Sequence, residues 1–222
     1  MKELFPNVMT MGNVFIAETL NTLYMVIISA LISGFFGLIM GVMLTYLGEG
    51  GLTENKSVYG ILDKITNFFR AIPFVILIAI IAPFTRILTG TTIGEKAAIV
   101  PLVFGTIPFF AKQVESALHS VDSGVIEAAE AMGLGSFEIM YRVYFREALP
   151  SLIRVSSITI ISLIGLTAMA GVIGAGGLGK VAIAMGHQRF RNDVTVFATV
   201  LILVLVYSVQ AISNVLVKKT AH

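Results

Sequence analysis

The sequence predicts an all-α integral membrane protein with five transmembrane helices and a cytoplasmic helical loop between the third and fourth spans. Of its 222 residues, 56% are hydrophobic and only 13% are charged, whereas soluble chains carry about 25% charged residues. The mean hydropathy of +0.92 agrees with this class. Several uncharged intervals are long enough to cross a bilayer, and one polar segment, residues 112–154, separates them.

Uncharged intervals locate the spans, because a charge at the bilayer centre costs roughly 2.5–3.5 kcal/mol. Residues 19–48, 155–179 and 194–217 contain no Asp, Glu, Lys or Arg, and each interval exceeds the ~20 residues that a helix needs. Two shorter apolar intervals, 71–85 and 97–111, become long enough when they are extended into flanking residues. The five predicted spans are 19–46, 66–84, 95–118, 155–176 and 194–217.

Prolines interrupt the second and third predicted spans at positions 73, 83, 101 and 108. A proline within a span frees a backbone carbonyl that a neighbouring helix or a wet cavity must satisfy. These residues are therefore either packed kinks or the lining of a pathway. Met169, in the fourth span, has the same two interpretations, because its polarisable side chain suits both packing and a soft gate. We take Met169, Pro73 and Pro108 as candidate pathway or gate residues.

Glycines gather within two of the spans. Small residues allow helices to approach closely in lipid, so tight packing is expected at these positions. They are Gly34, Gly37 and Gly41 in the first span, and Gly165, Gly171 and Gly174 in the fourth.

The run GAGGLGKV at 174–181 satisfies two nucleotide-binding patterns, G-x-G-x-x-G and most of the phosphate loop. Val181 replaces the Ser or Thr whose hydroxyl would hold magnesium. Both patterns need a buried strand before the loop and a helix after it, but here an uncharged membrane interval precedes it. We therefore expect no nucleotide site, and interpret the run as a flexible helix end.

Five spans place the two termini on opposite sides of the membrane. Nine Lys and Arg, among them Lys64 and Arg70, fall on the side of the polar segment, against six on the other side. The excess favours a cytoplasmic polar segment and C-terminus, with the N-terminus outside. Residues 1–14 are expected to form an N-terminal segment at the membrane interface, and residues 218–222 a cytoplasmic tail.

The polar segment predicts two short helices joined by a glycine hinge. Ser123 can cap the first helix, with Glu127 in its first turn, and Gly133 and Gly135 end it. Ser136 can cap the second, and Pro150 closes it. An apolar stripe in the second helix consists of Phe137, Met140, Tyr141, Tyr144 and Ala148. Such a unit is either a passive hairpin on the membrane surface or a lever that docks into a soluble partner.

The polar segment resembles the signature loop of ABC importer permeases, which reads E-A-A, three residues, Gly, nine residues, then I-x-L-P. Glu127, Ala128, Ala129 and Gly133 match it, and Val143 stands at the Ile position. Phe145 and Arg146 replace the Leu-Pro pair, which leaves the end of the second helix undefined. Three further runs are similar to the methionine-importer subfamily, and the likeness covers residues 15 to 217. They are FFRAIPFVILI at 68–78, PFTRILTGTTIG at 83–94 and AMAGVIGAGGLG at 168–179.

The resemblance implies a transport subunit of the bacterial cytoplasmic membrane, without catalytic residues of its own. Residues 15–217 would form the transmembrane domain, with the coupling loop at about 119–150. The subunit would pair with a second copy of itself and carry an amino acid, methionine in this subfamily. Its other partners would be membrane lipid, two cytoplasmic ABC ATPase subunits that bind ATP and Mg, and an extracytoplasmic substrate-binding protein or lipoprotein. The residues implied in coupling to the ATPase are Ser123, Glu127, Ala128, Ala129, Met132 and Gly133.

Other classes of function have less support in the sequence. There is no cysteine, and three histidines without ligand spacing make no metal site. A net charge of +2 without a basic cluster predicts no nucleic acid partner. The alternative is a channel or secondary transporter that needs no ATPase, but such proteins use ionisable residues within the membrane, and the uncharged intervals hold none. A membrane-embedded enzyme would need paired carboxylates or histidines there.

Overall fold

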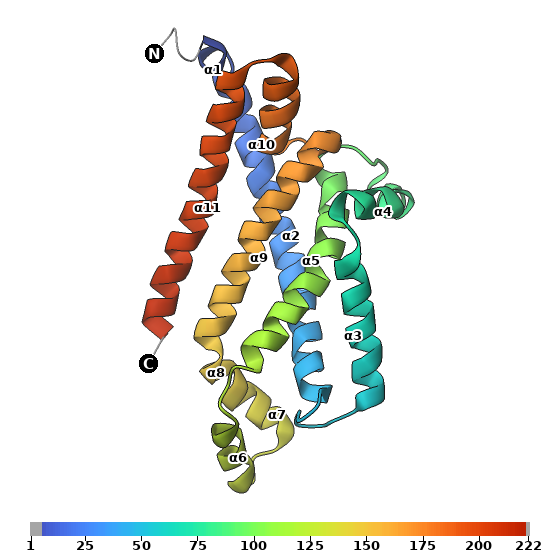
Figure 1. Cartoon of the computed structure of the whole chain (residues 1–222), viewed down its shortest axis with the longest axis vertical. Helices are drawn as coiled ribbons and strands as arrows, with labels where there is room; N and C mark the ends of the chain where they lie inside the picture. The colour runs from blue at the N-terminus through green and yellow to red at the C-terminus, as the bar shows by residue number, and fades with distance from the viewer. Residues whose placement is uncertain (1–5, 221–222) are drawn as a thin grey trace.

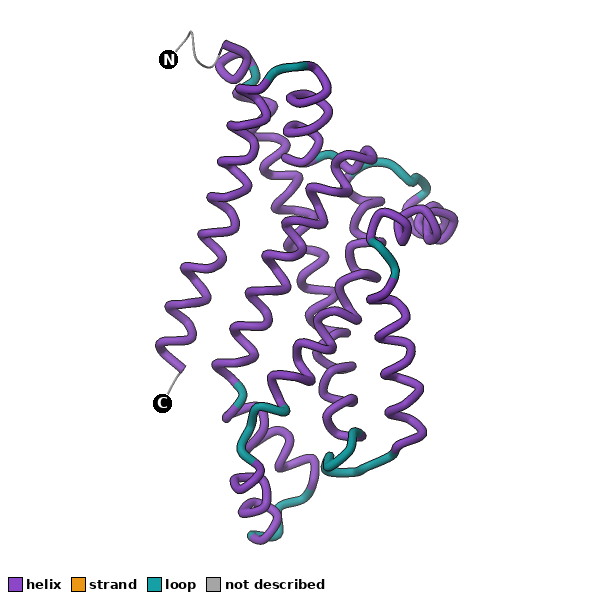
Figure 2. Tube along the Cα trace, viewed as in Figure 1, coloured by secondary structure: helices purple, strands orange, loops and turns teal. Residues whose placement is uncertain are grey.

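The computed structural model describes residues 6–220, all in helices or their connections, with no β-strand among them (Figures 1 and 2). Long helices run side by side along the long axis, and a smaller helical unit projects at one end. The elements, in chain order, are α1 (Pro6–Thr10), α2 (Gly12–Leu47), α3 (Lys56–Ala71), α4 (Phe74–Thr89), α5 (Glu95–Leu118), α6 (Ser123–Ala131), α7 (Ser136–Ile139), the π-helix η1 (Met140–Tyr144), α8 (Phe145–Glu147), α9 (Leu149–Ala170), the π-helix η2 (Gly171–Ala175), α10 (Gly177–Lys180), the π-helix η3 (Val181–Gly186), the 3₁₀-helix η4 (His187–Arg189) and α11 (Asn192–Thr220).

Four helices are long and apolar enough to cross a membrane, and they agree with four of the predicted spans. Helix α5 coincides with the predicted third span at both ends, whereas α2 and α11 extend beyond the predicted first and fifth. Helix α9 begins before the predicted fourth span and continues through η2 to Ala175. With the bent pair described next, the structure holds up to five spans.

The predicted second span, 66–84, is wrong as a continuous helix. The helix breaks at Ile72 and Pro73, and the direction of the chain bends by 108° between α3 and α4. Proline disfavours a helical conformation in the residue before it, and Ile72 is accordingly extended, with ψ 121°. Helix α3 lies beside the bundle, whereas α4 runs across it (Figure 1). Because α3 carries charges, the search for uncharged intervals could not detect it.

Helices α2 and α5 form the central contact of the bundle, and two glycines of α2 make it possible. A Cβ atom on Gly41 would lie 2.6 Å from the carbonyl oxygen of Ala111, and one on Gly37 would lie 2.9 Å from the Phe110 ring. The predicted close packing is confirmed at these two positions and at Gly171, where a Cβ would lie 2.6 Å from the Lys180 nitrogen. Within this chain, a Cβ on Gly34 or Gly165 would meet nothing within 4 Å, so close packing at these two positions stays a prediction.

The N-terminal segment folds onto one end of the bundle. The backbone N–H and the side-chain amide of Asn7 donate to the Asp193 carboxylate at 2.9 and 3.1 Å. Val8 and Met11 pack against a buried cluster around Phe15. The interfacial location expected for residues 1–14 stays a prediction, and its first five residues lie outside the described chain. At the other terminus, residues 218–220 of the expected tail continue α11.

Helix α1 lies at one end of the bundle, and α11 ends near the other, level with α8 (Figure 1). This agrees with an odd number of crossings. The charge count behind the predicted orientation weakens, however, because Lys64 and Arg70 lie along α3 rather than in a loop. Removing these two from the nine leaves seven against six, so the positive-inside rule no longer favours one orientation clearly.

Candidate functional site

The polar segment forms a compact unit, residues 119–148, at the end of the molecule opposite the N-terminus (Figure 1). It connects α5 to α9, and it consists of α6, a short turn, and a second helical stretch made of α7, η1 and α8. We call residues 119–148 the coupling loop, because α9 begins at Leu149 and residues 149–150 of the predicted loop belong to that helix.

Helix α6 begins one residue earlier than the capping prediction required. The Asp122 carboxylate accepts a hydrogen bond from the N–H of Gly124 at 2.7 Å, and Asp122 is the N-cap. Ser123 is instead the first helical residue. Asp and Ser are both good N-caps, so adjacent candidates leave the start ambiguous. Glu127 is then the fifth residue and lies outside the first turn, so the predicted helix-dipole contact is wrong.

The end of α6 is a left-handed turn built on Gly133. The N–H of Leu134 donates to the carbonyl of Ala129 at 3.2 Å, and that of Gly133 donates to Glu130 at 2.8 Å. This hydrogen-bond pair defines a Schellman motif, which needs a left-handed residue at Gly133. Its φ of +81° confirms the predicted glycine stop, and it sets the angle at which the chain leaves the helix.

The second helical stretch starts and ends differently from the prediction. Ser136 does not cap it; Gly135 is the N-cap residue, and the Ser136 hydroxyl donates to the carbonyl of Leu52 at 3.4 Å. Pro150 does not close it either, because Pro150 stands in the first turn of α9, where proline is well tolerated. Where the family pattern has its Leu-Pro pair, this chain has Phe145 and Arg146 in α8. Helix α9 begins at Leu149, with only one residue between it and the end of α8.

The predicted apolar stripe of this stretch is only partly buried. Met140, Tyr144 and Ala148 are buried, but Phe137 and Tyr141 are 81% and 72% exposed. The hydrogen bonding of η1 is of the wider π type, which shifts the periodicity on which the stripe was based.

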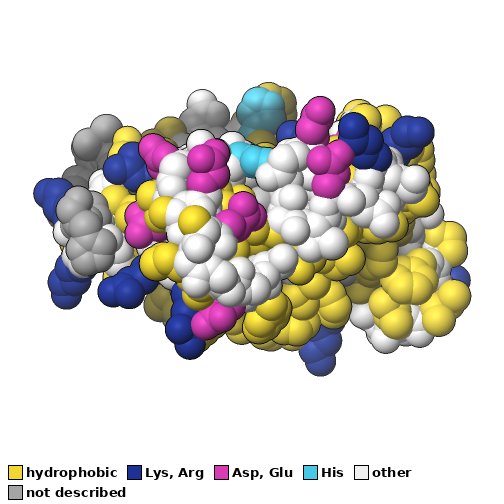
Figure 3. Space-filling view, turned by 90° about the horizontal axis from the view of Figure 1, so that it is seen from below, with side chains coloured by type: hydrophobic (Ala, Val, Ile, Leu, Met, Phe, Trp, Pro, Cys, Tyr) yellow, Lys and Arg dark blue, Asp and Glu magenta, His cyan; other side chains and the backbone are white. Residues whose placement is uncertain are grey.

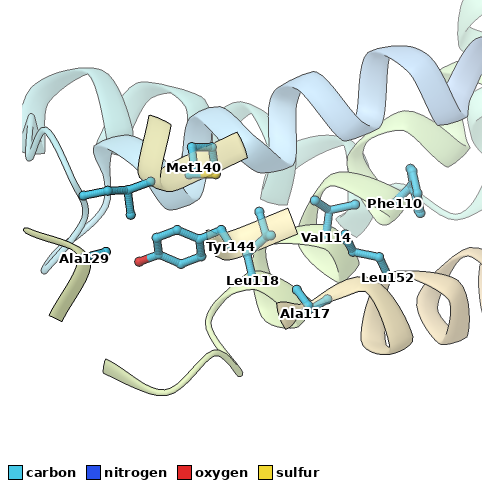
Figure 4. Close-up of a cluster of buried hydrophobic side chains, with 10 residues drawn as sticks. Phe110, Val114, Ala117, Leu118, Ala129, Met140, Tyr144 and Leu152 are labelled. Carbon is cyan, nitrogen blue, oxygen red and sulfur yellow. The ribbon is translucent and has the colours of Figure 1, made fainter. Parts of the chain in front are cut away.

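A hydrophobic cluster ties the coupling loop to the bundle (Figure 4). The Tyr144 ring lies between Ala129 of α6 and Leu118 at the end of α5, and Leu152 of α9 belongs to the same cluster. Burial raises the pKa of the Tyr144 hydroxyl above its ordinary value, and the charge of Glu130 adds to the rise. The cluster therefore links α6, by way of Tyr144, to the ends of α5 and α9.

The outer face of the coupling loop is exposed and mixes acidic with apolar side chains (Figure 3). Of the six residues predicted to contact a partner, only Ala129 is buried, at 2% exposure. Met132 is 74% exposed. Exposed apolar side chains beside charges are typical of a protein interaction site. The other predicted residues that lie on this face are Ser123, Glu127, Ala128 and Gly133.

The glycine-rich segment, residues 174–181, lies at the opposite end of the molecule and is rigidly packed. A Cβ on Gly177 would lie 2.7 Å from the Thr22 hydroxyl, and one on Gly179 would overlap Ala168. Gly174, Gly176 and Gly177 all have positive φ. The predicted helix end with backbone angles that other residues avoid is confirmed, and the flexibility of this segment stays a prediction.

A carboxylate from the first span fills the position that a phosphate would take in a nucleotide-binding loop. Glu18 accepts from the N–H of Gly177 at 2.6 Å and pairs with the Lys180 ammonium at 2.9 Å. The Thr22 hydroxyl accepts from the N–H of Leu178 at 2.8 Å. With no strand before the loop, this internal anion explains the glycine and lysine pattern. Sequence reasoning missed the pair, because Glu18 and Lys180 lie 162 positions apart.

The three candidate pathway residues differ in their surroundings. Pro73 is exposed at the break between α3 and α4, Pro108 is buried in α5, and Met169 is 42% exposed near the end of α9. A cavity of about 260 Å³ lies next to the two prolines, lined by Phe74 and Phe109 rather than by the prolines themselves.

Comparison with known proteins gives consistent matches. Residues 33–222 match the family described as "Binding-protein-dependent transport system inner membrane component". A D-methionine transport system permease of Vibrio cholerae is 40% identical over 211 residues, covering 95% of this chain and 94% of that protein. A methionine import system permease of Bacillus subtilis is 45% identical over 174 residues, covering 78% of each.

The fold agrees with solved structures. A chain from inward-facing conformations of the MetNI methionine ABC transporter superposes with a TM-score of 0.93 at 38% identity, covering 96% of this chain and 99% of that one. A chain from an amino acid ABC transporter superposes with a TM-score of 0.80 at 17% identity, covering 97% and 98%. The second match shows the fold alone.

Proposed function

Because the chain belongs to the binding-protein-dependent transport system inner membrane component family, we propose that it is the membrane permease subunit of an ATP-driven importer that carries methionine. The substrate follows from relatives at 40–45% identity that are named as methionine permeases. The chain itself supplies the pathway, and ATP hydrolysis belongs to a separate subunit.

The observation that carries the proposal is the exposed coupling loop. Helix α6 presents Glu127, Ala128 and Met132 outward, while Ala129 faces the Tyr144 cluster on the ends of α5 and α9. A soluble ATPase that binds the outer face of α6 would displace α6. Through the Tyr144 cluster it would then move the ends of α5 and α9. The transport cycle is then one of alternating access, in which paired permease subunits open their shared pathway to one side and then the other.

The proposed assembly is a permease dimer with two cytoplasmic ATPase subunits and an extracytoplasmic substrate-binding protein. The coupling loop and the C-terminus face the cytoplasm, and the N-terminal end with the glycine-rich segment faces outward. Helices α1 and α10 lie at this outer end, where the binding protein would dock (Figure 1).

Uptake by the reconstituted complex tests the proposal. The chain is reconstituted in proteoliposomes together with its partner ATPase and substrate-binding protein. The uptake of radiolabelled L-methionine is then measured with and without ATP inside the vesicles. ATP-dependent uptake that requires the binding protein is expected. Uptake without ATP, driven by an ion gradient, would assign the chain to the secondary transporters instead.

A further inference from the structure

An arginine lies part-way across the membrane bundle, inside the interval 66–84 that the sequence predicts as the second span. Arg70 stands on α3 fourteen positions after Lys56, which is about 21 Å along the helix axis at 1.5 Å per residue. Among the described residues its guanidinium forms no ion pair and donates one hydrogen bond, to the Asn67 side chain at 3.3 Å. Ionisable residues at membrane depth are costly and are typical of substrate pathways.

Arg70 lines the cavity of about 260 Å³ that opens between α3, α4, α5 and α9. Thr106 and Ser162 also line it, and each lies near the middle of its helix, α5 and α9 respectively. The cavity therefore lies near the middle of the membrane. Its volume is slightly below the roughly 300–1,000 Å³ typical of pockets for drug-sized ligands, which suits a single small metabolite.

One polar group of the cavity wall lacks a partner. The Thr106 hydroxyl is buried and makes no hydrogen bond in the described structure. Most threonines in these helices bond to a carbonyl in the preceding turn, as Thr159 does to Val155 at 2.8 Å. A buried hydroxyl without a partner is unfavourable. Rotation of the Thr106 side chain toward the cavity would let a polar ligand satisfy this hydroxyl.

The remaining wall is apolar, and no acidic residue belongs to it. Phe74 and Leu77 of α4 and Phe109 of α5 belong to this apolar wall. One cation, two hydroxyls and aromatic walls match a ligand with a carboxylate at one end and an uncharged, apolar side chain at the other. Arginine suits this role because its planar fork binds a carboxylate through two parallel hydrogen bonds.

We infer that this cavity is a transient binding site for the transported amino acid, in which Arg70 binds the α-carboxylate and Thr106 and Ser162 bind its polar main-chain groups. The apolar wall then holds the side chain. The inference rests on the proposed import function and adds the substrate class: amino acids with a free carboxylate and an apolar side chain.

Binding to the full-length chain alone tests the site without the ATPase or the binding protein. Radiolabelled L-methionine is bound to the chain in lipid nanodiscs, with L-methioninamide, which lacks the carboxylate, as competitor. We expect the amide to compete at least tenfold less well than the acid. Arg70→Gln should weaken methionine binding at least tenfold and remove the preference for the acid over the amide. Arg70→Lys should keep part of the affinity and part of that preference. Arg86→Gln, an exposed arginine of α4 outside the cavity wall, is the matched control and should leave both unchanged.

Thr106→Val keeps the assay informative if Arg70 variants misfold. Valine has nearly the same shape, and the lost hydroxyl has no partner, so folding should not suffer while methionine binding weakens severalfold. Ser29→Ala removes the other buried hydroxyl without a partner, on α2 outside this cavity, and should bind normally.

An Arg70→Gln chain with wild-type affinity and acid preference would overturn the site, as would a wild-type chain that binds neither ligand. Neither result affects the import function, which ATP-dependent uptake by the wild-type complex tests independently. Loss of uptake in Arg70→Gln with unchanged methionine binding would also overturn the inference.

Discussion

The ammonium of Lys180 lies 2.9 Å from the carboxylate of Glu18, and this contact joins the first span to the segment that follows the fourth. The same carboxylate accepts from the backbone of Gly177, so one side chain satisfies both a charge and a helix N-terminus. Glu18 is 7% exposed. The pair therefore acts as an internal clamp on the glycine-rich segment at the end of the bundle opposite the coupling loop (Figure 1).

Glu18→Ala should destabilise the protein. The change leaves the N–H of Gly177 and the Lys180 ammonium without their partner, and an unsatisfied buried group costs roughly 1–3 kcal/mol. The Tm of the purified chain in detergent should fall accordingly. Lys56→Ala removes an exposed ion pair with Glu54 at 3.4 Å, and such pairs contribute about 0–1 kcal/mol. Equal Tm values for the two variants would contradict the clamp.

Sequence reasoning located the spans that are bounded by charges and free of them inside. Helix α5 agrees at both ends although it also holds Lys96, Lys112 and Glu115, because its uncharged interval, 97–111, is extended into these flanking residues. The search for uncharged intervals failed for α3, because this helix carries charges. One of them, Asp63, forms an ion pair with Lys112 of α5. A charge that finds its partner on a neighbouring helix can remain within the bundle, and no count of charges along one segment reveals that partner.

Within the coupling loop, local rules predicted the glycine stop but not the start of α6. Gly133 was predictable because few other residues adopt a left-handed turn. Asp122 and Ser123 are equally good caps, so their order could not be decided. The contact of Ala129 with Tyr144 depends on how the loop folds back on α5 and α9, which helical spacing does not determine.

Labelling of introduced cysteines should show which end of the molecule faces the cytoplasm. The chain has no native cysteine. Phe190, 92% exposed after η4, and Arg142 on the coupling loop are the positions to replace. In intact cells an impermeant maleimide should label position 190 and leave position 142 unlabelled until the membrane is opened. Labelling of 142 alone in intact cells would invert the orientation and refute the cytoplasmic coupling loop.

Glu127→Lys should weaken assembly with the ATPase and leave membrane insertion intact. Glu127 is exposed on the outer face of α6, so the change alters the charge that a partner meets without disturbing the buried cluster. Co-purification of the ATPase should fall severalfold, as expected for the loss of interface contacts worth about 1 kcal/mol or more. Glu49→Lys makes the same charge change on an exposed loop residue outside α6 and should assemble normally. Equal recovery of the ATPase with both variants would remove Glu127 from the interface.

Gly133→Val should uncouple transport from ATP hydrolysis. The residue has a φ of +81°, and a Cβ there would meet nothing within 4 Å. The cost is therefore backbone strain alone, roughly 1–2 kcal/mol for a residue with a β-carbon. The chain can relieve this strain by changing the angle between α6 and the following turn. The spans do not depend on that angle, so membrane insertion and assembly should persist.

The rates of methionine uptake and ATP hydrolysis, measured in the same proteoliposomes, test whether Gly133→Val uncouples the two. Uptake per ATP should fall for Gly133→Val, because a misaligned α6 no longer moves α5 and α9 together through the Tyr144 cluster. Gly135→Val is the matched control, since Gly135 has an ordinary φ of −72° and equally open surroundings. It should keep the wild-type ratio. If Gly133→Val keeps that ratio as well, the glycine serves only to end the helix, and the angle of α6 does not govern coupling.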